Sequence, residues 1–122
     1  MLQSPAPVLL VDSNRDGLEL YSTALALAGI GSDTTESAGQ ALEWVARHPP
    51  RVLVTGLRLR DARATELIRE VRDTTVPDGI YIVGLSTNTR LESEPAQNAG
   101  CDVVLPVPCL PETLVEELRR VL

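Results

Sequence analysis

Several polar residues of this chain follow apolar runs directly, where their side chains could do chemistry. Asp12 and Ser13 come after the run VLLV, and Ser86 and Thr87 come after IYIVGL. Hydroxyls and backbone N–H groups after a buried strand can hold an anion. A magnesium ion dehydrates reluctantly and is bound through one or two carboxylates. Asp12 alone is therefore a poor metal site, and we expect no metal or cofactor.

Arginines flank these positions in the sequence. All 11 basic residues are arginine, and Arg15, Arg58, Arg60 and Arg63 lie on expected loops at the same end of the chain's strands. Two interpretations stay open. The arginines are solvated surface residues, as loop charges usually are, or Arg15 or Arg58 enters the site and pairs with Asp12.

The elements that position these residues follow from five apolar runs that alternate with amphipathic stretches. We expect strands at Pro7–Asp12, Ile30–Glu36, Val52–Thr55, Ile80–Leu85 and Asp102–Leu105. We expect helices at Asp16–Gly29, Ala38–Arg47, a stretch through Leu67, Ile68 and Val71, Asn88–Asn98, and from Pro111 onward. Pro77, Asp78 and Gly79 predict a turn.

The inner faces of three helices follow from helical periodicity. They comprise Leu18, Tyr21, Leu25 and Leu27 in the first helix, Leu42 and Val45 in the second, and Leu114, Leu118 and Val121 in the last. The weakly apolar second strand suits a sheet edge. Cys101 and Cys109 have no metal-ligand or redox-motif spacing and are expected to be buried thiols.

Alternating strands and helices of this length predict an α/β fold. We expect one domain, residues 1–122, with a five-stranded parallel sheet of flavodoxin type in the order 2-1-3-4-5. In such a doubly wound fold, ligands gather at the carboxyl ends of strands 1 and 3. Asp12 and Gly56 occupy those ends.

Four segments, in this order and spacing, resemble the receiver domain of two-component response regulators. They are VLLVDSN, PPRVLVTGLRL, IYIVGLST and AGCDVVLPVP, and the resemblance spans roughly Pro7–Leu122. It implies a phosphorylated Asp after strand 3, an acidic pair that holds magnesium after strand 1, a Ser or Thr after strand 4, and a Lys-Pro after strand 5. Phosphoryl transfer needs such cations because charge gathers on the phosphoryl oxygens.

This chain departs from that pattern at the residues that do the chemistry. The vestigial pocket implied by the resemblance consists of Asp12, Ser13 in place of the second acid, Gly56 in place of the phosphoacceptor, Ser86, Val107 in place of the lysine, and Pro108. The aromatic position on strand 5 falls on Val104. Thr55 and Asp61 are the nearest substitute acceptors, but Thr55 should face the other side of the sheet and Asp61 lies further along the loop.

We therefore expect an atypical receiver domain that is not an enzyme and that binds a protein partner or dimerises independently of phosphorylation. Receivers commonly use the face of helix 4, strand 5 and helix 5, which here carries Arg90, Glu94, Val103, Val104, Glu116 and Arg120. The net charge of −6 argues against direct contact with nucleic acid. No apolar run is long enough to span a membrane. We expect a cytoplasmic, bacterial protein.

One alternative function stays open. The altered pocket could sense a small anion or metabolite through Arg15, Arg58, Arg60 and Thr87. An enzymatic function lacks support, because the sequence contains no phosphate-binding loop, no dinucleotide fingerprint, and no evident nucleophile for its single histidine to serve.

Overall fold

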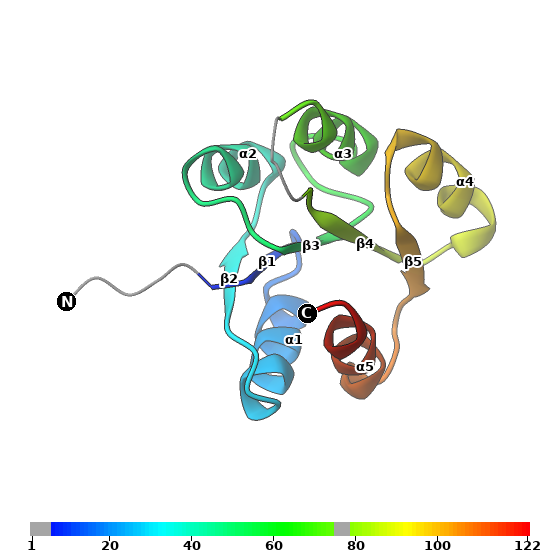
Figure 1. Cartoon of the computed structure of the whole chain (residues 1–122). Coiled ribbons are helices and arrows are strands. Elements are labelled where there is room, and N and C mark those ends of the chain that lie inside the picture. The colour runs from blue at the N-terminus through cyan, green and yellow to red at the C-terminus, as the bar shows by residue number, and fades with distance from the viewer. Residues whose placement is uncertain (1–5, 75–78) are drawn as a thin grey trace.

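A computed structural model describes residues 6–74 and 79–122. It shows three layers, with a central sheet covered on one side by α1 and α5 and on the other by α2, α3 and α4 (Figure 1). Pro77 and Asp78 of the expected turn lie outside the described residues.

The expected elements are present, with boundaries that shift by a few residues at most. The strands are β1 Val8–Val11, β2 Ser32–Thr35, β3 Val52–Gly56, β4 Tyr81–Ser86 and β5 Val103–Pro106. The helices are α1 Arg15–Leu27, α2 Ala38–Arg47, α3 Ala64–Asp73, α4 Thr89–Ala99 and α5 Pro111–Val121.

The sheet confirms the predicted topology. All four strand pairings are parallel, and the order is β2-β1-β3-β4-β5. Val11 pairs with both Thr35 and Thr55, which aligns the ends of the first three strands. Gly56 and Ser86 end β3 and β4. The residues after these strands are thereby brought to one edge of the sheet.

Alternate residues of each strand face the two helical layers, because side chains in a strand alternate between faces. Leu53 and Ile82 join the apolar cluster under α2, α3 and α4. Val54 and Val83 join the cluster under α1 and α5. Both faces of the sheet are buried, as expected for a parallel sheet.

One predicted core residue is wrong. Leu27 is 86% exposed, whereas Leu18, Tyr21 and Leu25 are buried. Leu27 lies roughly 200° around the helix from Leu25 and so points away from the sheet. Of the predicted buried thiols, Cys101 is buried, but Cys109 is only half-buried.

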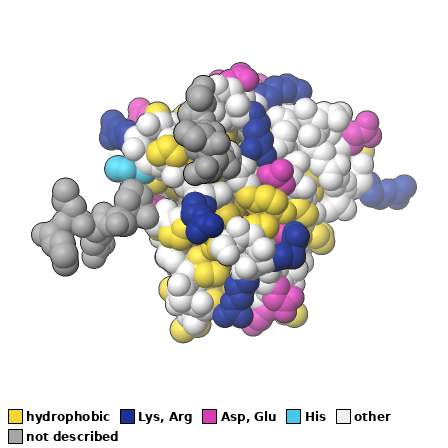
Figure 2. Space-filling model, viewed as in Figure 1, with side chains coloured by type: hydrophobic (Ala, Val, Ile, Leu, Met, Phe, Trp, Pro, Cys, Tyr) yellow, Lys and Arg dark blue, Asp and Glu magenta, His cyan; other side chains and the backbone are white. Residues whose placement is uncertain are grey.

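Two further observations concern the surface. On the side seen in Figure 2, hydrophobic side chains in the middle and lower part of the view are interspersed with arginines. Within residues 6–74 and 79–122, no helix has the length and hydrophobicity needed to cross a membrane.

Candidate functional site

Gly56 lies directly against Asp12 at the carboxyl end of the sheet. A Cβ atom built on Gly56 would lie 2.9 Å from Oδ2 and 3.0 Å from Cγ of Asp12. The Asp12 carboxylate is held in place by the backbone N–H of Asn14, which donates to Oδ1 over 3.1 Å. A side chain at position 56 would therefore press against the Asp12 carboxylate, and one of the two would have to shift.

Ser13 ties two loops together. Its hydroxyl accepts a hydrogen bond from the backbone N–H of Arg60 over 3.0 Å and donates to the carbonyl oxygen of Glu36 over 3.4 Å. These contacts join the loop after β1 to the loops after β2 and β3. At this position the chain has a hydroxyl that connects loops instead of a second carboxylate.

Val107 occupies the position where the resemblance implies a lysine, and both its side chain and its neighbours are apolar. Val107 is half-buried and packs against the cluster under α1 and α5. Its backbone N–H donates to the carbonyl oxygen of Ser86 over 2.8 Å. The Val107–Pro108 peptide bond is cis. Val107 joins the site to the core and supplies no charge.

Of the two interpretations of the arginines, the one in which Arg15 or Arg58 pairs with Asp12 is wrong. Nε of Arg15 donates to Oε1 of Glu36 over 2.7 Å, and Nε of Arg58 donates to Oε2 of Glu92 over 3.0 Å. The hydrogen bond to Glu36 raises the pKa of Arg15, and the bond from Arg15 lowers the pKa of Glu36. Each guanidinium therefore pairs with a glutamate from another loop or helix, and not with Asp12.

An open hollow of about 540 Å³ lies over these loops. Its lining residues are Asp12, Ser13, Asn14, Arg15, Asp16, Glu36, Arg58 and Arg60. The lining carries three acidic and three basic side chains. Arg15 is engaged by Glu36 and Arg58 by Glu92, so the hollow offers an anion less positive charge than the count of arginines indicates.

The two substitute acceptors point elsewhere. Thr55 is fully buried, and its hydroxyl donates to the carbonyl oxygen of Gly56 over 2.8 Å. The carboxylate of Asp61 accepts the backbone N–H groups of Ala38 and Gly39, both over 3.0 Å. These two bonds lower the pKa of Asp61. Asp61 caps the start of α2 and is committed to that helix.

Ser86 has an intramolecular partner that the sequence analysis missed. The Ser86 hydroxyl is buried and donates to Oε1 of Glu92, while Thr87 next to it is exposed. Glu92 lies in the first turn of α4, after the N-cap Asn88. The sequence signal is an acidic residue in the first helical turn, which predicts a favourable interaction with the helix dipole and not contact with a strand.

The residues do not fit a magnesium ion. The carboxylate nearest to Gly56 is that of Asp12, and one of its oxygens already accepts the backbone N–H of Asn14. Across residues 6–74 and 79–122, no three side chains of His, Cys, Asp or Glu cluster closely enough to hold a metal. Magnesium keeps several waters and is usually held by one or two carboxylates, and here the second position is Ser13, whose hydroxyl is bound to Glu36 and Arg60.

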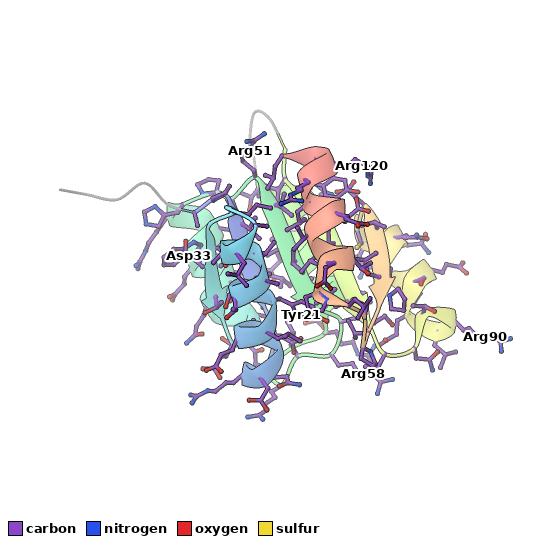
Figure 3. All side chains as sticks on the ribbon, turned by 90° about the horizontal axis from the view of Figure 1, so that it is seen from below. Tyr21, Asp33, Arg51, Arg58, Arg90 and Arg120 are labelled. Carbon is purple, nitrogen blue, oxygen red and sulfur yellow. The ribbon has the colours of Figure 1, made fainter. Side chains whose placement is uncertain are left out.

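The expected interaction face is continuous in space but not one apolar patch. Arg90 and Glu94 on α4 and Glu116 and Arg120 on α5 are exposed on either side of β5. Figure 3 shows Arg90 and Arg120 pointing outward from these two helices.

The two valines of this face point to opposite sides of β5. Val103 packs against the cluster under α5, and Val104 packs against the cluster under α4. Each valine is half-buried. The exposed part of the face is therefore mostly charged side chains around the open edge of the strand.

Comparison with known proteins gives matches only among solved structures. No family model matches the sequence, and no curated protein matches it significantly. The chemotaxis response regulator CheY4 of Vibrio cholerae is 27% identical, with a TM-score of 0.88 over 98% of this chain and 100% of that chain.

Two further structures agree. A CheY-like receiver domain protein of Methanospirillum hungatei is 22% identical, with a TM-score of 0.86 over 96% of this chain and 93% of that one. A putative response regulator of Chloroflexus aurantiacus is 22% identical, with a TM-score of 0.88 over 97% and 98%. These similarities confirm the resemblance: the chain has the fold of the response-regulator receiver domain.

Proposed function

We propose that this chain is an atypical receiver domain that acts in signalling as a protein-interaction or dimerisation module without being phosphorylated. One observation carries the proposal: position 56 has no side chain, and the Asp12 carboxylate packs so closely against it that a Cβ there would lie 2.9 Å from Oδ2. A phosphoryl group needs a nucleophile and nearby cations. Gly56 provides no nucleophile, and the pocket contains Val107 and Ser13 at the positions of the lysine and the second acid.

The proposed binding surface is the α4–β5–α5 face, made of Arg90, Glu94, Val103, Val104, Glu116 and Arg120. Its support is the combination of an edge strand with exposed charges on both flanking helices. An edge strand offers backbone donors and acceptors to another chain, and charges beside it set the orientation of a partner. The occupant is a second copy of this chain or another signalling protein.

The first experiment tests for phosphorylation. The protein is incubated with magnesium and a small-molecule phosphodonor, and its intact mass is measured beside a conventional receiver domain as positive control. We expect no mass increase while the control gains one phosphoryl group. A gain of one phosphoryl group by this chain would overturn the proposal.

A second experiment tests the binding surface. Sedimentation equilibrium is measured over a wide range of concentrations, for the wild type and for a variant with Glu94→Arg and Glu116→Arg. If the chain dimerises through this face, the double variant dissociates at concentrations where the wild type and a Glu43→Arg control on α2 remain dimeric. Amide hydrogen exchange gives an independent check. If the amides of this face gain no protection at high protein concentration or with a signalling partner, the assignment of the binding surface is wrong.

A further inference from the structure

A hollow of about 290 Å³ lies between α3 and α4, which are neighbours on one side of the sheet (Figure 1). Ala96, which is fully buried, and Leu57, which packs against the core under these helices, line its inner part. Leu91 and Pro95 of α4 are exposed and line its edge. The hollow is therefore an opening in the surface with apolar walls.

The packing of α4 does not account for the residues at this edge. Leu91 is 70% exposed, whereas the helix packs on the sheet through Ala96 and Ala99. Pro95 has no N–H group, so the carbonyl oxygen of Leu91 receives no hydrogen bond from the residue four positions later. An apolar side chain and an acceptor without its usual helical donor thus lie together at the edge of the hollow. Burial of this side chain against a partner is favourable, because apolar surface is removed from water.

The free charge beside the hollow is positive. Arg58 and Arg63 line it, and Glu92 is the acidic residue of the lining. Both oxygens of Glu92 are already bonded, one to Ser86 and one to Arg58. Arg63 is exposed and forms no ion pair with any residue that the structure describes. A cation therefore lies beside apolar surface in a chain whose net charge is −6.

The size of the hollow favours one side chain of a protein over a complete small ligand. Ligand pockets usually have volumes of about 300–1,000 Å³ and enclose most of the ligand. This hollow lies at the lower limit of that range and is open to solvent. Protein interfaces commonly bury one large apolar side chain in a pocket, with charged residues around it that select and orient the partner.

We propose that this hollow binds a segment of a partner protein in which one apolar side chain lies between acidic residues. The apolar side chain packs against Leu57, Leu91 and Ala96, and a carboxylate of the segment pairs with Arg63. The segment is acidic because the free charge at the edge of the hollow is a cation. This inference goes beyond the proposed function, because none of the residues named for the α4–β5–α5 face lines the hollow.

The test uses three tripeptides with acetylated and amidated ends as probes, of sequence Glu-Leu-Glu, Lys-Leu-Lys and Glu-Ser-Glu. Methyl resonances of Leu57, Leu91 and Ala96 are followed by NMR during titration into the wild type at constant ionic strength and pH. We expect saturable shifts with Glu-Leu-Glu, and binding at least several-fold weaker with each of the other two peptides. Equal responses to all three peptides would overturn the proposal, and so would the absence of a saturable shift with millimolar Glu-Leu-Glu.

A charge reversal at Arg63 assigns the preference to the proposed cation. The Arg63 side chain makes no capping bond to α3, and an acidic residue at a helix start interacts favourably with the helix dipole, so Arg63→Glu keeps the fold. We expect this variant to bind Lys-Leu-Lys more tightly than Glu-Leu-Glu. Arg69→Glu, on the exposed side of α3, is the matched control and should keep the wild-type order. An unchanged order in Arg63→Glu contradicts the proposal.

A substitution at the edge of the hollow tests the apolar contact. We expect Leu91→Ser to weaken the binding of Glu-Leu-Glu at least several-fold, because the partner's apolar side chain loses one wall of its pocket. Gln97→Ser, at an exposed position of the same helix, should bind as the wild type does. Equal binding by the two variants would show that the peptide does not use the hollow.

Dilution of the wild type without peptide tests a second copy of this chain as the occupant. If the methyl resonances of Leu57 and Ala96 shift with protein concentration, the chain itself fills the hollow and the proposed partner class is wrong. We expect no such shift. None of these readouts depends on phosphorylation, so a phosphorylated wild type would overturn the proposed function and leave this result unchanged.

Discussion

At the scale of single residues, the contact between Asp12 and Gly56 defines the site. The carboxylate of Asp12 lies against Gly56, and the backbone N–H of Asn14 holds it there by a hydrogen bond. Because Gly56 does not have a positive φ, its backbone would accept another residue. The constraint on position 56 is therefore space, and the atoms that limit it belong to Asp12.

A methyl group at position 56 tests this contact. We expect Gly56→Ala to displace the Asp12 carboxylate and lower the free energy of unfolding by about 1 kcal/mol, the usual net contribution of one hydrogen bond. In a background with Asp12→Ala, the same substitution should cost much less. Chemical denaturation of the four proteins of this double-mutant cycle measures the coupling. Equal costs in both backgrounds would show that Asp12 does not limit position 56.

At the scale of elements, Asp61 connects the loop after β3 to the start of α2. Its two oxygens accept the N–H groups of Ala38 and Gly39, in addition to the Ser37 side chain that accepts from Gln40. Carboxylates at a helix start satisfy free N–H groups and interact favourably with the helix dipole. The loop that would carry a substitute acceptor instead stabilises the neighbouring helix.

The Asp61 cap predicts a pH-dependent contribution to stability. Its folded pKa is lowered, so the contribution is complete above the unfolded value of about 4 and disappears as the pH falls through the lower folded pKa. We expect Asp61→Asn to lower the melting temperature by a few degrees at neutral pH, and by less at a pH of about 3. Thermal unfolding at both pH values measures this difference.

A control variant separates the cap from general charge effects. Glu43 is exposed on the same helix, and Glu43→Gln should change the melting temperature little at neutral pH. A deficit in Asp61→Asn that stays the same at both pH values would contradict an ionic cap.

At the scale of the whole molecule, Arg72 of α3 connects its helix to the last two strands through hydrogen bonds and an ion pair. Its guanidinium donates to the carbonyl oxygens of Gly100, over 2.8 Å and 2.6 Å, and of Ile80, over 2.5 Å. It also pairs with Asp102 over 2.7 Å, and Asp102 accepts the backbone N–H of Ile82. One side chain thus bridges α3, the end of α4, and the starts of β4 and β5.

This bridge predicts a large effect of one substitution. We expect Arg72→Ala to lower the free energy of unfolding by about 2 kcal/mol, because hydrogen bonds to charged groups contribute more than neutral ones and two carbonyl groups lose their partner. Arg69→Ala, on the exposed side of the same helix, is the matched control and should have little effect. Denaturant titration of both variants tests this, and equal stabilities would show that the bridge contributes little.

The strands and helices could be located from the sequence alone, because each follows from local periodicity. VLLV and IYIVGL predict buried strands, and Asn88 and Pro111 mark helix starts that the structure places at the same positions. The absence of lysine and the glycine at position 56 also follow from the sequence alone. These features depend on residue type and spacing along a short segment.

The pairing of the charged side chains, by contrast, depends on the folded structure. Arg15 bonds Glu36 across 21 positions, and Arg58 bonds Glu92 across 34 positions, whereas the sequence suggested only solvated arginines or a pairing of one of them with Asp12. The periodicity of a segment fixes which face of a helix or strand is buried. It does not fix where a long, flexible side chain ends, because that depends on which loops the fold brings together. For this reason the contacts of Glu92 with Ser86 and Arg58 could not be predicted from the sequence.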